Sequence, residues 1–343
     1  MYTPSFSITN KILSNIGTIE AARQVIINAP LLPYWEKKFQ EDAAIRTTHY
    51  GTHIEGNELS LNQVQRVLEG EQIVARERDV QEVINYRNVV SYIGDKKDAI
   101  IDEDSIFELH NIVVDKILSP LESGRYREKD VVIRNSITGE VSFKPPRSIE
   151  VEWQIKDLID FIKSEREMHP VLKTGVVHYE FVRIHPFLDG NGRVGRALSM
   201  LVLFRENYDV RKFFSIEEHF DRDPEAYYEA LQSVEKTNGD LTVWLEYFTN
   251  ALAIELSKIR EKIEHISIDS TLKKKLGGPV MLTDRQLKII EYMQEIGYLE
   301  NKVFANLFPD VSEDTALREV QDLVKKGIIV KRGRTKGVKY LMA

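Results

Sequence analysis

Apolar positions recur at helical spacing along most of this chain. Within RDVQEVINYRNVVSYIG, for example, Val80, Val83 and Ile84 fall on one helix face, and SLNQVQRVLEG opens with a capping box of Ser60 and Gln63. Helical spacing also runs through WQIKDLIDFIKSE, VLKTGVVHYEFVRI, GRVGRALSMLVLFREN, PEAYYEALQSV and DLTVWLEYFTNALAIELSKIREKI. The pattern therefore predicts a mainly α fold.

The pattern changes after about residue 121, where a short two-stranded element is predicted. The runs DVVI and EVSF flank NSITG, whose polar residues and Gly139 suit a tight turn. Pro145 and Pro146 end the second strand, because proline cannot donate a ladder hydrogen bond. We therefore predict a β-hairpin over residues 131–143.

These elements divide the chain into parts. Residues 1–120 are predicted as an N-terminal helical region and residues 121–265 as the core. The segment KKKLGGP, within a predicted linker at 266–279, precedes a predicted separate domain at 280–343.

The last domain is predicted to combine three short helices with two strands. Thr283 and Gln286 form a capping box, Ser312 is the expected N-cap of the third helix, and IIVKRGRTKGVKYLM reads as a basic hairpin. This arrangement resembles a winged helix-turn-helix domain, which implies a DNA or protein partner. The basic residues placed to meet phosphates are Arg318, Lys331, Arg332, Arg334 and Lys336. A protein contact is the opposing interpretation, because the third helix also carries Glu313, Asp314, Glu319 and Asp322.

Composition excludes several classes of protein. The chain has 343 residues and no cysteine, which excludes disulfides, thiolate metal sites and cysteine nucleophiles. It has no apolar run of about 18 residues and no evident signal peptide, so we expect a cytoplasmic protein without a membrane partner. The net charge is −7, yet the end KRGRTKGVKYLMA has five basic residues and no acid. This contrast favours a nucleic-acid or acidic partner for the last domain.

The densest group of polar and turn-forming residues is HPFLDGNGRVGR, residues 185–196, between two apolar helical stretches. We expect the second helix to restart at about Arg193, because the positions before it favour turns, namely Pro186, Gly190, Asn191 and Gly192. Backbone N–H groups at a helix start converge on an anion, and the helix dipole favours negative charge there. The stretch therefore predicts an anion-binding loop.

The side chains of this stretch supply the other parts of a phosphate-transfer site. Arg193 and Arg196 lie three residues apart on the predicted helix, so both can reach a polyphosphate. Asp189 supplies an oxygen ligand for Mg²⁺ held partly by phosphates, and His185 can take a proton from a hydroxyl. Each feature alone is more often structural, but their density in one turn favours phosphate transfer. The spacing is not that of a Walker loop.

The stretch HPFLDGNGRVGR matches the signature of the Fic family, HPFx(D/E)GNGRxxR, at every specified position. The resemblance extends over about residues 43–248. It implies a Fic-type helical bundle with a β-hairpin flap, and an enzyme that transfers AMP from ATP to Ser, Thr or Tyr hydroxyls of proteins, itself included. It also implies ATP as co-substrate and Mg²⁺ as cofactor.

The resemblance assigns a role to each matching residue. His185 would deprotonate the target hydroxyl, Asp189 would hold Mg²⁺, and Arg196 would hold the γ-phosphate. Tyr228, in AYY, would contact the nucleoside, and a half-buried tyrosine of an amphipathic helix is the alternative. The expected nucleotide-binding residues are Glu55, His185, Gly190, Asn191, Gly192, Arg193, Val194, Gly195, Arg196 and Tyr228.

The predicted hairpin gains a role through the same resemblance. The flap of the family aligns a target segment by strand addition, and residues 133–143 occupy its place. Without the signature downstream, a purely structural hairpin would be the preferred interpretation.

A second candidate lies upstream, in YGTHIEGNELS. The residues alone place Glu55 at the end of a helix, which Gly56 terminates. Many Fic proteins carry S/T-xxx-E-G/N on a helix whose glutamate pairs with the second signature arginine and blocks productive ATP binding. The resemblance thus implies an inhibitory helix near 43–57, in which Glu55 pairs with Arg196. Gly51 stands where the hydroxyl residue is expected and Thr52 lies one place nearer, which leaves the supporting hydroxyl open.

Other functions stay open at this point. A DNA-binding regulator could use nucleotide only as a sensed ligand, although a regulator would need no base at His185. A Fic fold could instead remove AMP from proteins, with Glu55 positioning water, or transfer another phosphate-linked group. We expect a homodimer from the resemblance alone, and the sequence does not identify the target protein or the preferred nucleotide.

Overall fold

The computed structural model of this chain describes residues 2–29, 31, 33–96, 100–134, 141–266, 282–309, 311–333 and 338–342. The chain divides into two compact units. The first comprises Met1–Asn28 and Glu36–Arg260, and the second comprises Ala29–Trp35 and Glu261–Ala343.

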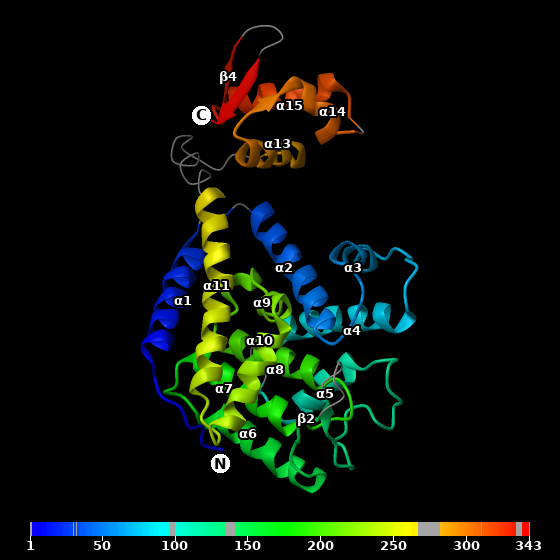
Figure 1. Ribbon diagram of the computed structural model, residues 1–343. Coiled ribbons are helices and arrows are strands. Elements are labelled where there is room, and N and C mark those ends of the chain that lie inside the picture. Colours follow the sequence, from blue (N-terminus) through cyan, green and yellow to red (C-terminus); the bar gives the residue numbers. More distant parts are fainter. Residues whose placement is uncertain are drawn as a thin grey trace. The chain divides into compact units, whose positions relative to one another are not determined.

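The first unit is built almost entirely from helices, as the apolar spacing predicts (Figure 1). The α-helices that lie wholly or mostly in it are α1 (Asn10–Asn28), α2 (Pro33–His53), α3 (Leu61–Leu68), α4 (Glu77–Asp95), α5 (Glu103–Val113), α6 (Val151–Ser164), α7 (Pro170–Ile184), α8 (Asn191–Arg205), α9 (Ile216–Arg222), α10 (Pro224–Lys236) and α11 (Thr242–Ile266). Two 3₁₀ segments are η1 (Ser148–Glu150) and η2 (Val210–Lys212). Among the helices of the described residues, none combines the length and apolar character that crossing a bilayer requires.

Helices α7 and α8 form the centre of the first unit. They pack against each other, while α4 and α5 pack on α8 and α6 packs on α7. Most residues of both helices are buried, because their sequences are largely apolar around the whole helix. The buried ammonium of Lys173 is paired with Glu206 at 2.8 Å. The stretch HPFLDG therefore connects two helices whose positions the core fixes.

The loop between α7 and α8 is bounded by two residues in the left-handed conformation. His185 caps α7 with φ 52° and ψ 60°, and Gly190 precedes α8 with φ 79°. Helix α8 begins at Asn191, two residues earlier than predicted. The Asn191 side chain explains the difference, because it accepts a hydrogen bond from Phe187 N and donates one to Phe187 O, both at 2.8 Å. Asn191 is therefore part of the first turn of α8, from which it stabilises the loop, and is not part of the loop itself.

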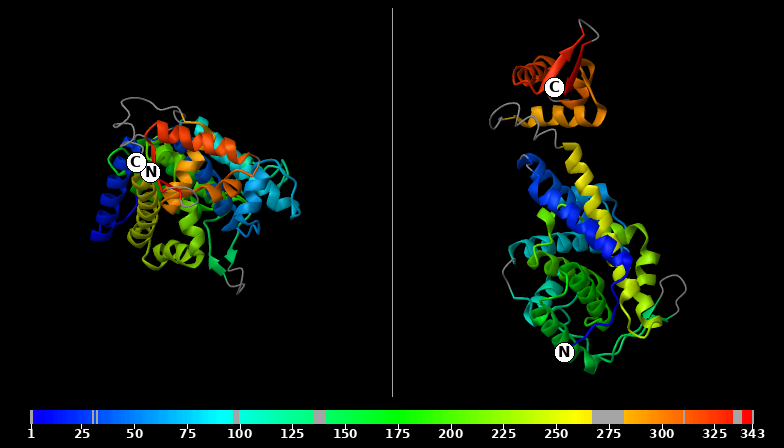
Figure 2. Two further views of the ribbon diagram at one scale, coloured as in Figure 1. Left: turned by 90° about the horizontal axis from the view of Figure 1, so that it is seen from above. Right: turned by 90° about the vertical axis from the view of Figure 1, so that its left-hand side faces the viewer.

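The predicted hairpin strands are present in the first unit. Strand β1 (Ile133–Arg134) pairs antiparallel with β2 (Val141–Phe143), and Ile133 lies opposite Phe143. The predicted turn NSITG lies outside the described residues. Figure 2 shows the strands at the edge of the helices of their own unit.

Capping signals of the sequence are confirmed in both units. The capping box of Ser60 and Gln63 opens α3, and the box of Thr283 and Gln286 opens α13. Ser312 accepts a hydrogen bond from Thr315 N at the start of α15. Such caps depend on residues three positions apart, which is why the sequence reveals them.

The second unit combines short helices with a three-stranded antiparallel sheet of order β3-β5-β4. Its elements are α13 (Asp284–Ile296), β3 (Leu299–Glu300), η3 (Asn301–Val303), α14 (Phe304–Leu307), α15 (Glu313–Lys325), β4 (Ile329–Arg332) and β5 (Lys339–Met342). The three predicted helices and the two predicted strands are present, and β3 was not predicted. The winged-helix assignment stays a prediction.

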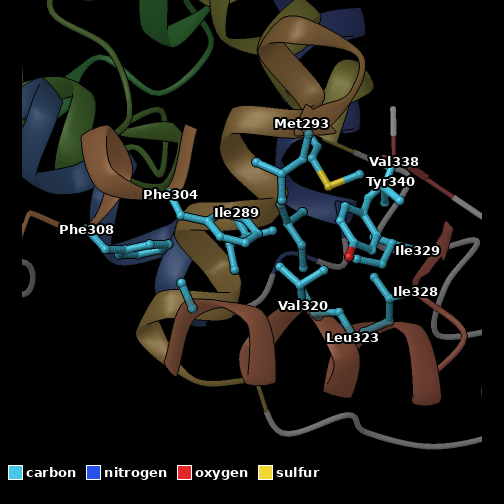
Figure 3. Packing of buried hydrophobic residues seen from close by; sticks show 13 residues of the cluster. Ile289, Met293, Phe304, Phe308, Val320, Leu323, Ile328, Ile329, Val338 and Tyr340 are labelled. Carbon is cyan, nitrogen blue, oxygen red and sulfur yellow. The ribbon is translucent and has the colours of Figure 1, made fainter. Parts of the chain in front are cut away.

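The second unit has its own hydrophobic core, in which α13, α15 and the sheet contribute facing side chains (Figure 3). Met293 of α13, Leu323 of α15 and Tyr340 of β5 are among its buried members. Arg318, Lys331 and Arg332 are exposed, as a phosphate-binding surface would require. Arg334, Lys336 and most of the predicted linker at 266–279 lie outside the described residues.

We expect Leu323→Ala to destabilise the second unit. The Leu323 side chain is 0% exposed, so its truncation leaves a cavity that costs about 2–5 kcal/mol of unfolding free energy. Hydrogen exchange of the α15 amides, followed by mass spectrometry, measures the loss. Val330→Ala is the control, because Val330 is 39% exposed in β4. Equal loss of protection in both variants would contradict this core.

Candidate active site

The loop between α7 and α8 is tied to the hairpin region by one buried arginine. Arg127 is 2% exposed, and its Nε donates to the carbonyl of His185 at 2.8 Å. Its other nitrogens donate to the carbonyls of Lys129 and Pro146, which flank the hairpin on either side. The Arg127 amide also donates to Pro186 O at 2.9 Å. Sequence reasoning missed this residue, because an arginine within YREKD gives no signal that it is buried.

A second missed residue, His110 of α5, supports the same loop from the other side. Its ring stacks on Phe187 with 3.7 Å between centroids and 4° between planes. Its Nδ1 accepts from Gly124 N at 2.9 Å, so Nε2 carries the proton and donates to Asp189 O at 3.2 Å. Burial lowers the pKa of His110 to about 4, which keeps the ring neutral. A neutral ring suits one donor and one acceptor bond.

His185 lies at the start of this braced loop. Burial lowers the pKa of His185 to about 4, against the opposing charge of Glu55. The imidazole is therefore neutral near pH 7 and can accept a proton. Its Nδ1 is buried and has no hydrogen-bond partner among the described residues. The histidine is thus positioned by its backbone, through Arg127, and its ring is left available for chemistry.

A carboxylate of the same chain, that of Glu55, faces the start of α8. A Cβ on Gly192 would lie 2.1 Å from Glu55 Oε1, so the glycine lets an anion approach the helix terminus closely. Glu55 Oε1 accepts from Arg196 Nη2 at 2.8 Å, and the Arg196 side chain is only 1% exposed. Burial raises the pKa of Glu55, but Arg196 and Arg193 outweigh it and hold that pKa below its usual value. The pair is therefore ionic at neutral pH.

Gly51, which stands where the resemblance expects a hydroxyl residue, contacts Arg196, the partner of Glu55, through its backbone. Arg196 Nη2 also donates to the carbonyl of Gly51 at 3.0 Å. A Cβ on Gly51 would lie 2.3 Å from the Tyr86 ring, so only glycine allows this approach of α2 to α4. The Thr52 hydroxyl donates back to Thr48 O and His49 O of its own helix.

Asp189 stands between two arginines. Its Oδ1 accepts from Gly190 N at 2.6 Å and from Arg193 Nη2 at 3.1 Å, and its Oδ2 lies 2.9 Å from Arg78 Nη2. Burial raises the pKa of Asp189, but Arg193, the Gly190 amide and Arg78 hold it below its usual value. Among the described residues, no group of three or more His, Cys, Asp or Glu side chains is arranged so that it could hold a metal ion. A divalent cation here would have to take most of its ligands from water and phosphate, which suits Mg²⁺.

The remaining predicted residues lie in two places. Tyr228 of α10 is 43% exposed, and burial, with Glu55 nearby, raises its pKa to about 12. It therefore lies near the Glu55–Arg196 pair. Val194 is buried in α8, and a Cβ on Gly195 would lie 2.9 Å from Val182 of α7. These two residues let α7 and α8 pack closely behind the loop.

We expect Gly51→Ala to lower the unfolding free energy by about 1–3 kcal/mol, because the new methyl group has to displace the Tyr86 ring. Gly17→Ala is the matched control in α1, where a Cβ would meet nothing within 4 Å. Alanine there should be neutral or stabilise by up to about 1 kcal/mol. Urea unfolding followed by circular dichroism measures both. A stable Gly51→Ala protein would contradict the close approach of α2 to Tyr86.

We also expect stability to fall with acid between about pH 6.5 and pH 4. Burial lowers the pKa of His110 and of His185 to about 4 and that of His178 to about 3. In the unfolded chain these rings take up protons near pH 6.5, so acid favours unfolding throughout this range. Urea unfolding at successive pH values measures the slope. His178→Gln removes one of the three rings and should make the slope shallower; an unchanged slope would contradict the neutral state of that ring.

Comparison with known proteins agrees with this geometry. The model of the Fic/DOC family matches residues 100–203, which include the whole loop from His185 to Arg196. Protein adenylyltransferase Fic of Nematostella vectensis is 26% identical over 241 residues, which are 68% of this chain and 52% of that protein. Protein adenylyltransferase fic-1 of Caenorhabditis elegans is 31% identical over 163 residues, which are 45% of this chain and 30% of that protein. The chain thus spans about half or less of the length of these curated relatives.

Solved structures share the fold. A Fic family protein from Desulfovibrio desulfuricans G20 matches with a TM-score of 0.70 at 24% identity, covering 100% of this chain and 98% of that chain. A Fic-1 fragment from Caenorhabditis elegans matches with a TM-score of 0.59 at 22% identity, covering 75% of this chain and 74% of that chain. Residues 100–203 therefore match a Fic domain, and the fold of the chain is that of Fic family structures.

Proposed function

We propose that this chain is a protein adenylyltransferase that moves AMP from ATP to Ser, Thr or Tyr hydroxyls of proteins, itself included, and that Glu55 restrains it. The observation that carries the proposal is one loop that combines neutral His185, a glycine-lined helix start and buried Arg196. Relatives named protein adenylyltransferase support the same reaction.

The start of α8 would hold the phosphates of ATP. The amide of Gly192 lies where the helix dipole favours negative charge, Gly190 leaves room for a close approach, and Arg193 adds a guanidinium in the same turn. Arg196 would bind the γ-phosphate, because its buried cation requires an anionic partner. Tyr228 would contact the nucleoside from α10.

His185 would act as the base. The target hydroxyl gives its proton to the neutral imidazole, and its oxygen forms a bond to the α-phosphorus. The bond between the α-phosphorus and the bridging oxygen breaks, and pyrophosphate leaves. The low pKa of His185 keeps the base unprotonated at neutral pH. Arg127 fixes its backbone in the required place.

Asp189 would hold Mg²⁺. The Asp189 carboxylate suits a cation, because its Oδ2 already lies 2.9 Å from a positive group, the Arg78 guanidinium. When bound, the ion would neutralise negative charge on the phosphates. The chain's own contribution is to orient Asp189, through the Gly190 amide and the bond from His110 to the Asp189 carbonyl.

Glu55 would restrain transfer by competing with the γ-phosphate for Arg196. Its carboxylate lies 2.8 Å from Arg196 Nη2 and faces the α-carbon of Gly192, so carboxylate and phosphate cannot both occupy this place. The β1–β2 hairpin would align the target segment by strand addition, because Arg127 links its base to the His185 loop.

Transfer of label from ATP labelled at the α-phosphate, with Mg²⁺ and with or without lysate, tests the proposal. We expect Glu55→Gly to raise labelling roughly ten- to a hundredfold, because it removes a charge-assisted hydrogen bond that competes with ATP. His185→Ala should lower labelling of the Glu55→Gly protein by about 10²–10⁴, the usual contribution of a general base.

Glu58→Gly is the matched control for the inhibitory residue. Glu58 lies three residues after Glu55, its side chain is 77% exposed and it pairs with Arg76 rather than Arg196, so labelling should stay at the wild-type level. Equal stimulation by both glycine variants would show that loop flexibility, not the Glu55 carboxylate, controls activity. No label in any variant, with nucleotide binding intact, would favour AMP removal, another donor or a nucleotide-sensing regulator.

A further inference from the structure

Four charged side chains form a closed ring beside the loop. Arg78 and Glu82 come from α4, and Asp189 and Arg193 come from the loop and the start of α8. Arg78 lies 3.0 Å from Glu82 through Nε and 2.9 Å from Asp189 through Nη2. Arg193 lies 3.2 Å from Glu82 through Nη1 and 3.1 Å from Asp189 through Nη2. Each arginine therefore bridges both carboxylates.

The ring has a buried side and an open side. The side chains of Glu82 and Arg193 are 7% and 3% exposed, whereas those of Arg78 and Asp189 are 59% and 33% exposed. Glu82 is fixed further by Asn57, whose Nδ2 donates to Glu82 Oε2 at 3.1 Å. Of the four side chains, Arg78 can therefore break its ion pair with Asp189 at the lowest cost in free energy, because exposed ion pairs are weak.

Oδ2 of Asp189 is the oxygen that Arg78 covers. The Gly190 amide and Arg193 approach the other oxygen, Oδ1. A divalent cation on Asp189 would therefore take Oδ2, at about 2.1 Å for Mg²⁺. A guanidinium and a metal ion cannot share that place, because they repel each other at such short range.

We propose that Arg78 is the resident cation of Asp189 and competes with the divalent cation for Oδ2, so that it sets the metal affinity of the site. The inference rests on the proposed role of Asp189 as metal ligand. Arg78 does not touch the reacting atoms and is a positioning residue. When Arg78 Nη2 releases Asp189, the guanidinium keeps a partner, because its Nε still donates to Glu82.

Titration of nucleotide-free protein with Mn²⁺, followed by the electron paramagnetic resonance signal of the free ion, tests this. Arg78→Gln should bind Mn²⁺ about tenfold more tightly than the wild type, since a positive charge beside the metal position is gone. Asp189→Asn should lose the binding. The gain from Arg78→Gln should shrink at high salt, because Arg78 is largely exposed and its charge is screened.

Arg87→Gln is the matched control. It removes the same charge from the same helix, but the Arg87 guanidinium donates its hydrogen bonds to Asn88 and lies outside the ring. Its Mn²⁺ affinity should equal that of the wild type. Thermal unfolding of each variant shows whether the fold is retained, and exposed Arg78 should tolerate the change.

Unchanged or weaker Mn²⁺ binding by Arg78→Gln would overturn the proposal, and so would a gain of equal size in Arg87→Gln. Wild-type binding by Asp189→Asn would also overturn it, because the metal would then lie elsewhere. The titration contains no nucleotide, so its outcome is separate from that of the labelling experiment. Absence of AMP transfer with the expected Mn²⁺ result would reject the proposed function and leave the role of Arg78 standing.

Discussion

One buried cation organises the region around the site. The Arg196 side chain is 1% exposed, and an arginine does not lose its proton in a protein. A charge in that position requires an anionic partner, because an unpaired buried ion costs several kcal/mol. Glu55 and the carbonyl of Gly51 provide the partners here, which draws the end of α2 over the start of α8. In the proposed function the γ-phosphate of ATP would be the anionic partner of Arg196, so the Glu55 carboxylate and the nucleotide could not bind Arg196 at the same time.

The loop that carries His185 is held by residues with no part in the proposed chemistry. Arg127 binds its carbonyl, His110 stacks on Phe187, and Asn191 closes the loop through two bonds to Phe187. Each support lies on a different element, so the loop cannot shift unless several contacts break together. This rigidity allows His185 to keep a left-handed backbone and a neutral ring.

Helix α4 links the Glu55 segment to the start of α8. Its Tyr86 packs on Gly51, its Glu82 holds both Asn57 and Arg193, and its Arg78 reaches Asp189. The turn after Glu55 and the first turn of α8 therefore share one buried carboxylate. A change at Glu82 would be felt at both places, which makes α4 a structural part of the site although it lies outside the matched Fic domain.

Much of the local structure follows from the sequence, because its causes lie a few residues apart. Apolar spacing predicts the helices, the capping boxes at Ser60 and Thr283 mark two helix starts, and the order of residues from His185 to Arg196 indicates a phosphate site. Helix α8 starts two residues before the predicted position, because asparagine favours turns, whereas the bonds of Asn191 to Phe187 form only in the folded loop.

Only the tertiary structure decided which distant residues complete the site. The spacing of the chain does not reveal that Arg78, Glu82, His110 and Arg127 meet the loop, since each looks like an ordinary polar residue of a helix or turn. The contact that leaves no room for a larger side chain at Gly51 is likewise made by Tyr86, on another helix. Sequence by itself determined the helices, their caps and the chemical groups of one loop, because these depend on neighbours along the chain. Packing determined which charges are buried and therefore which partners they need, because burial depends on elements that are far apart in sequence.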